Sequence, residues 1–177
     1  MYILSSFDKE VLKKIRVLYE ASFPKEEKKP FPVMLEKLRA KQMIFYAIFN
    51  EKDEFSGFML TAKHGNVLLL DYFAIEPEMR GLGIGSYALA KLCEMHADKS
   101  VVIEIEDERV PCADTVQRIR RKNFYIKCGM KIMPYEISLF GVKMRVLTNG
   151  NEVPFDEYHA VYRCVFGEGV AKNIFLI

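Results

Sequence analysis

The sequence predicts one mixed α/β domain over residues 1–177, with a central, mostly antiparallel mixed sheet of about six or seven strands flanked by helices. Three observations lead to this fold class. A chain of 177 residues, 50% of them hydrophobic, has the size and apolar content of one domain with one core. Two apolar runs separated by a short polar turn are typical of a β-hairpin. A later strand, helix and strand predict one parallel βαβ crossover.

The N-terminal part is predicted to be helical. Apolar residues three and four positions apart predict a helix over residues 8–22, with Ser5 and Ser6 before its start. A charged loop over residues 25–29 follows. Prolines on either side of residue 31 then lead into a short helix over residues 33–41.

Apolar and aromatic runs predict the first strands. Residues 43–50 and 55–63 form a hairpin around the polar turn at residues 51–54. The run over residues 67–75 is so continuously apolar that we expect both faces of this strand to be buried, and only Asp71 interrupts it.

The second half of the chain continues to alternate between helices and strands. A helix begins at the glycines of residues 81–85 and ends near residues 96–99, and a strand over residues 101–105 completes the crossover. The other predicted elements are a helix over residues 114–128, a strand pair over 130–135 and 142–147, a helix over 155–166 and an apolar tail over 174–177. This tail can dock in its own sheet or in that of a partner, which allows a homodimer.

Charge and hydropathy exclude several classes of partner. With 26 basic and 24 acidic residues the formal net charge is +2, so no bulk attraction to nucleic acid or to an anionic membrane is expected. There is no signal-peptide pattern and no apolar run of about 18 residues, which predicts a cytoplasmic protein. The four cysteines are widely spaced without a Cys-x-x-Cys pair, so neither a metal site nor a disulfide is expected.

Residues 80–86, here called the glycine loop, carry the strongest functional signal. Alternating glycines at a helix start let backbone N–H groups turn toward a ligand, and the helix N-terminus adds partial positive charge. The loop is therefore predicted to bind a pyrophosphate through Arg80, Gly81, Leu82, Gly83, Ile84, Gly85 and Ser86. A Rossmann turn is the nearest rival, but it needs glycine or alanine in place of Ser86 and a shorter gap after the strand. A Walker loop requires a lysine and then a serine or threonine directly after its last glycine. It is excluded because Gly85 is followed by Ser86 and Tyr87.

The glycine loop resembles the pyrophosphate motif of the GNAT superfamily of N-acetyltransferases, Gln/Arg-x-x-Gly-x-Gly/Ala, through Arg80, Gly83 and Gly85. A second motif, Phe124-Tyr125 followed by Gly129-Met130, resembles the Phe-Tyr-x-x-x-Gly-Phe signature of the same family. The resemblance covers residues 67–135. It implies the GNAT fold and an acetyltransferase with acetyl-CoA as its cosubstrate.

The resemblance also implies roles for individual residues. The backbone of Phe73, Ala74 and Ile75 would lie along the cofactor and supply an N–H donor to the oxyanion formed during acetyl transfer. Tyr125 would be the general acid that protonates the departing CoA thiolate, because a phenol with a pKa near 10 is protonated at neutral pH. A core tyrosine on a helix face would give the same sequence pattern.

The motifs do not identify the general base. An alkylamine arrives as an ammonium ion and must lose a proton before it attacks, so Glu106 and Asp71 are candidates for proton transfer or amine binding. Glu104 shares a strand face with Glu106 by period-two alternation. Ordinary solvated acids at strand ends would fit equally well. The segment that contains Glu27 is similar to a substrate-side loop of arylalkylamine-type relatives, which makes Glu27 a substrate-binding candidate or part of a solvated linker.

Together these residues predict direct transfer of an acetyl group from acetyl-CoA to a primary amine of a small molecule within a ternary complex. Two alternatives stay open. One is acetylation of a protein or peptide, which would need an open groove for backbone. The other is a non-catalytic sensor of acyl-CoA, which would have lost the acid at position 125.

Overall fold

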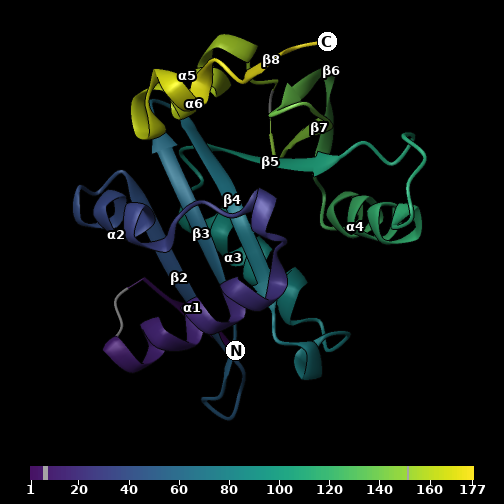
Figure 1. Cartoon of the computed structure of the whole chain (residues 1–177). Helices are drawn as coiled ribbons and strands as arrows, with labels where there is room; N and C mark the ends of the chain where they lie inside the picture. The colour runs from purple at the N-terminus through teal and green to yellow at the C-terminus, as the bar shows by residue number, and fades with distance from the viewer. Residues whose placement is uncertain (6–7, 151) are drawn as a thin grey trace. The chain divides into compact units, whose positions relative to one another are not determined.

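The structure, a computed structural model, describes residues 1–5, 8–150 and 152–177 (Figure 1). The chain divides into two units. The first contains Met1–Ala62 and Asp71–Leu92, and the second contains Lys63–Leu70 and Cys93–Ile177. The fourth strand contributes to both units.

The first unit carries antiparallel strands covered by helices. Its elements are β1 (Tyr2–Leu4), α1 (Lys9–Ser22), the 3-10 turn η1 (Lys25–Glu27), α2 (Phe31–Arg39), β2 (Met43–Phe49), most of β3 (Phe55–His64), the second half of β4 (Val67–Ile75), η2 (Pro77–Met79) and most of α3 (Ile84–Met95). β2 pairs antiparallel with both β1 and β3. The helices bury an apolar stripe, which in α1 consists of Ile15, Leu18 and Tyr19.

The second unit is built around a second set of strands. Its elements are the first half of β4, β5 (Ser100–Glu106), α4 (Thr115–Lys127), β6 (Lys131–Leu139), β7 (Val142–Thr148), α5 (Phe155–Phe166), α6 (Glu168–Ala171) and β8 (Ile174–Leu176). β4 and β5 are parallel, with Val67 opposite Ser100 and Leu70 opposite Ile103. β7 pairs antiparallel with β5 and β6, and β6 pairs antiparallel with β8.

The strands are hydrogen-bonded in the order β1-β2-β3-β4-β5-β7-β6-β8, which confirms a mixed, mostly antiparallel sheet with a parallel crossover. The structure has eight strands in its described part, whereas the sequence predicted six or seven. The difference lies in β1 and β8, each only three residues long and too short to show a period of two. β8 is the predicted apolar tail, and it docks in the chain's own sheet.

Some helix boundaries differ from the prediction. The cap of α1 is Asp8, whose carboxylate accepts hydrogen bonds from the N–H groups of Glu10 and Val11, both at 2.9 Å. Ser5 therefore does not cap the helix, and Ser6 lies outside the described residues. α2 begins at Phe31, earlier than predicted, because proline is tolerated in the first turn of a helix.

The expectation that β4 is buried on both faces holds only for its first half. Val67–Leu70 are buried, but Asp71, Phe73 and Ile75 are partly exposed as whole residues and alternate with the buried Tyr72 and Ala74, although the side chain of Asp71 itself is only 3% exposed. β3 approaches this second half closely at Gly57, where a Cβ atom would lie 2.4 Å from the carbonyl oxygen of Ala74. Glycine at this position lets the two strands come together.

Candidate functional site

The glycine loop lies between η2 and α3 in the first unit. Gly81 and Gly83 have φ angles of +80° and +79°, a left-handed conformation that favours glycine. No atom lies within 4 Å of the place where a Cβ would stand at either glycine, so the backbone conformation, and not crowding, requires glycine there. Leu82 between them is 64% exposed. The loop therefore presents its backbone to solvent.

The start of α3 gives this loop the chemistry of an anion site. The helix begins at Ile84, and its first N–H groups have no acceptor within the helix. Together with the helix dipole, these groups favour a bound phosphate. The geometry therefore fits the predicted pyrophosphate site over Ile84, Gly85 and Ser86.

Arg80 adds a positive charge at the entry to the loop. Its Nε donates a hydrogen bond to the carbonyl oxygen of Ile75 at 3.1 Å, so the side chain is held at the end of β4. Burial and the charge of Glu78 raise the pKa of the nearby Glu76, while Arg80 acts in the opposite direction.

Asp71 is nearly buried in β4, with a side chain 3% exposed. Its Oδ1 lies 2.7 Å from the Nζ of Lys29. Its Oδ2 is buried and has no hydrogen-bond partner among the residues that the structure describes. A carboxylate in so apolar a strand needs a partner that offsets the cost of its burial. Lys29 is that partner, and no periodic pattern in the sequence could have identified it.

The loop between α1 and α2, residues 23–30, is held against β4 by Tyr72. The Tyr72 hydroxyl accepts a hydrogen bond from the N–H of Lys29 at 3.0 Å and donates one to the carbonyl oxygen of Glu27 at 2.7 Å. The Tyr19 hydroxyl donates to the carbonyl oxygen of Lys29 at 2.8 Å. Glu27 therefore helps to fix this loop through its main chain, and its predicted role in substrate binding stays a prediction.

Tyr125 lies in α4 of the second unit and is 8% exposed. Burial raises its pKa to about 12, against a smaller opposite effect of Arg121. The phenol is thus protonated at neutral pH, as a general acid requires. Gly129, in the same sequence motif, has a φ angle of +87° and ends α4, which explains the glycine of that motif.

Glu106 is bound to α4 through two arginines. Its Oε1 lies 2.5 Å from Nη2 of Arg118, and its Oε2 lies 3.1 Å from Nη1 of Arg121. The side chain of Glu106 is 14% exposed. Both of its oxygens thus contact guanidinium groups in charge-assisted pairs.

Glu104, on the same strand, is bound by two tyrosines of α5. The Tyr162 hydroxyl lies 2.8 Å from both carboxylate oxygens, and the Tyr158 hydroxyl donates to Oε1. Both phenols are fully buried or nearly so. Burial and the charge of Glu104 raise the pKa of Tyr158 well above its usual value. Sequence reasoning missed these tyrosines, although their spacing of four residues places them on one helix face.

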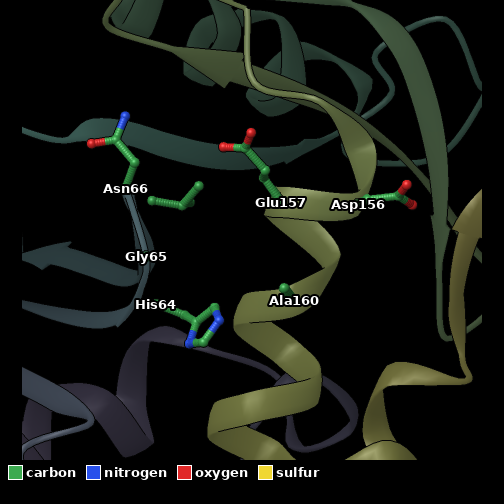
Figure 2. Close-up of a pocket in the computed structure, with 7 residues that line it drawn as sticks. His64, Gly65, Asn66, Asp156, Glu157 and Ala160 are labelled. Carbon is green, nitrogen blue, oxygen red and sulfur yellow. The ribbon is translucent and has the colours of Figure 1, made fainter.

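A cavity of about 380 Å³ lies between the β3–β4 turn and the start of α5, within the second unit (Figure 2). In Figure 2 the side chain of Glu157 extends toward Asn66, whereas that of Asp156 points away from the turn. His64 lines the cavity from the end of β3, and its Nε2 lies 3.6 Å from Sγ of Cys164. The residues of the predicted site do not line this cavity.

Over the described residues, no group of three or more His, Cys, Asp or Glu side chains is arranged to hold a metal ion. No helix in the described part of the chain combines the length and the apolar character needed to cross a membrane.

The chain matches the family model "Acetyltransferase (GNAT) family" over residues 12–129. A protein from Bacteroides thetaiotaomicron described as an acetyltransferase of the GNAT family shares 24% identity and a TM-score of 0.73, over 94% of this chain and 99% of that one. An aminoglycoside 6′-N-acetyltransferase in complex with coenzyme A has 20% identity and a TM-score of 0.63, over 87% of this chain and 100% of that one. A spermidine N-acetyltransferase from Vibrio cholerae in complex with CoA and spermine has 9% identity and a TM-score of 0.64, over 83% and 93%. No sequence among curated proteins matches.

Proposed function

The chain belongs to the acetyltransferase (GNAT) family, and from this we propose that it transfers an acetyl group from acetyl-CoA to a primary amine of a small molecule. The glycine loop is the observation that carries the proposal, because Gly81 and Gly83 adopt left-handed conformations directly before a helix start. In this proposal the loop binds the pyrophosphate, and the backbone of Phe73, Ala74 and Ile75 contacts the rest of the cofactor.

Two side chains would move the protons of the reaction. The acceptor nitrogen attacks the thioester carbonyl carbon directly, and a backbone N–H of β4 stabilises the oxyanion. Tyr125 protonates the departing thiolate, a role that its buried, protonated phenol supports. Asp71 accepts the amine proton. We favour Asp71 over Glu106 because Asp71 Oδ2 has no partner among the described residues, whereas both oxygens of Glu106 contact arginines.

The names of two similar folds support a small-molecule acceptor, since one acts on aminoglycosides and the other on spermidine. Both substrates carry primary amines that are cationic at neutral pH. An acidic residue is suited to bind such an amine and to take its proton. Asp71 has this chemistry in the same unit as the glycine loop.

Calorimetry and an amine screen test the proposal. We expect acetyl-CoA to bind and NADH to bind more weakly or not at all, because the loop does not follow the dinucleotide fingerprint. Aminoglycosides, polyamines and arylalkylamines are then added with acetyl-CoA, and release of CoA thiol is measured. Tighter binding of NADH, or no thiol release with any amine despite acetyl-CoA binding, would overturn the proposal.

A further inference from the structure

A primary amine of the chain itself lies against the strand that is proposed to hold acetyl-CoA. The Nζ of Lys29 is 2.7 Å from Asp71 Oδ1 and 5.1 Å from the centroid of the Tyr72 ring. Asp71 and Tyr72 directly precede Phe73 on β4. Lys29, these residues and the glycine loop all belong to the first unit.

The position of Lys29 is fixed by its main chain as well as its side chain. Its N–H donates to the Tyr72 hydroxyl, and its carbonyl oxygen accepts from the Tyr19 hydroxyl. The ammonium group also lies near the face of the Tyr72 ring, a favourable cation–π arrangement. Holding an amine beside the proposed cofactor strand raises its effective concentration for reaction.

The neighbouring Lys28 provides a natural comparison. Its Nζ lies 2.6 Å from Oε2 of Glu20 on α1. The side chains of Lys28 and Lys29 are 17% and 23% exposed, and each contacts a carboxylate, that of Glu20 and that of Asp71. The two side chains are therefore similarly shielded, and Lys29 is the one whose ammonium group lies beside Asp71 and Tyr72 of β4.

We propose that the ε-amine of Lys29 is an acetylation site for the acetyl-CoA bound by the same chain, an inference that rests on the proposed function. The Lys29 ammonium gives one proton to Asp71, and the neutral nitrogen attacks the thioester carbonyl carbon. A C–N bond forms and the C–S bond breaks. The second proton lost by the nitrogen ends on the CoA thiolate, so the products are acetyl-lysine, CoA thiol and a protonated Asp71 that returns its proton to water.

The arrangement of Asp71 supports this direction of proton transfer. Its Oδ1 already contacts the Lys29 ammonium, and its buried Oδ2 has no hydrogen-bond partner among the described residues. Acetylation removes the positive charge of Lys29 and leaves Asp71 without this ion pair. External amines compete for the same thioester, so acetylation of Lys29 is expected to be fastest when no acceptor is present.

Mass spectrometry tests the inference directly. The full-length protein is incubated with acetyl-CoA and no amine, cleaved at acidic residues, and the acetyl occupancies of Lys28 and Lys29 are compared over time. We expect Lys29 to exceed Lys28 by about tenfold or more, a ratio that positioning alone can supply. The rate should not depend on protein concentration, because the reaction is intramolecular.

Two variants separate this reaction from chemical acetylation. Gly83→Asp, which lies outside the lysine pair, should reduce Lys29 occupancy to that of Lys28. Lys28→Arg should leave Lys29 occupancy unchanged. Non-enzymatic acetylation would instead favour exposed lysines such as Lys13, which is 70% exposed.

The outcomes also distinguish this inference from the proposed function. Lys29 occupancy no higher than that of Lys28, in a protein that releases CoA with an external amine, overturns the inference and leaves the function intact. If neither acetyl-lysine nor amine-dependent thiol release appears, both are overturned.

Discussion

Tyr125 combines burial with a protonated hydroxyl at the position that the family motif gives to a general acid. We expect Tyr125→Phe to reduce kcat by about 10²- to 10⁴-fold, the usual contribution of general acid catalysis, while acetyl-CoA affinity changes little. The phenylalanine keeps the ring and removes only the hydroxyl. Steady-state kinetics and calorimetry on the same sample measure the two effects.

A structural tyrosine would behave differently. Its replacement would lower the melting temperature and leave the turnover of folded protein near normal. A melting curve of Tyr125→Phe therefore accompanies the kinetics, and unchanged kcat would assign the proton transfer to water or to a carboxylate.

Asp71 and Glu106 are the two candidates for the general base, and their amide variants can be compared directly. We expect Asp71→Asn to reduce kcat far more than Glu106→Gln, because Asp71, unlike Glu106, has a buried carboxylate oxygen without a hydrogen-bond partner among the described residues. Glu106→Gln should mainly lower stability, since it leaves two arginines of α4 without their shared anion. Turnover per folded molecule separates the two effects. A larger loss of kcat in Glu106→Gln would transfer the role of base to Glu106.

At the scale of elements, the glycine loop offers a test of conformation and charge together. Gly83→Asp should abolish acetyl-CoA binding, because a left-handed residue with a side chain costs about 1–2 kcal/mol and its carboxylate would face the phosphates. Gly65→Asp is the control, since Gly65 also has a positive φ of +54° and lies in the β3–β4 turn. Calorimetry should show normal acetyl-CoA affinity in the control. Equal losses in both variants would mean that the effect is general destabilisation.

The long helices and strands were predictable because the apolar pattern that identifies each one lies entirely within its own segment. α5 has the predicted bounds, and β4 was identified from its unbroken apolar run. β1 and β8 were missed as strands because three residues show no period, and their strand character depends on pairing with distant partners. The strand β6 continues to Leu139, beyond its predicted end at residue 135, because the turn follows at Phe140 and Gly141.

Parts of the candidate site could be predicted only where all the residues of that part lie in one short segment of the sequence. The glycine loop is a local motif, and its left-handed glycines agree with it. The ion pair of Lys29 with Asp71 joins residues 42 positions apart, and the contact of Tyr158 with Glu104 spans 54 positions. Such pairs depend on tertiary packing, which periodicity and spacing do not encode.

For the whole molecule, buried tyrosines predict sensitivity to alkaline pH. Burial raises the pKa of Tyr46, Tyr125 and Tyr135 to about 12, from 10.0 for an exposed phenol. At a pH between 10 and 12, these three phenols are deprotonated in the unfolded chain and still protonated in the folded chain. The free energy of unfolding therefore falls as pH rises from about 10 to about 12, and this contribution is fully present below pH 10.

Melting curves across that range, together with tyrosinate absorbance, measure the effect. We expect the melting temperature to fall above about pH 10 and part of the tyrosinate signal to appear only on unfolding. Titration of all phenols near pH 10 without loss of stability would contradict the conclusion that burial raises the pKa of these three phenols.

The hydrogen bond from the Lys29 N–H to the Tyr72 hydroxyl also makes one backbone amide a reporter of loop opening. This amide is bonded to a side chain of β4, so its hydrogen exchanges with deuterium when the α1–α2 loop lifts from the strand. Exchange at Lys29 should therefore follow the opening of this loop without any attached label. A bound acceptor that displaces the loop would speed this exchange, whereas one that enters beneath a closed loop would slow it.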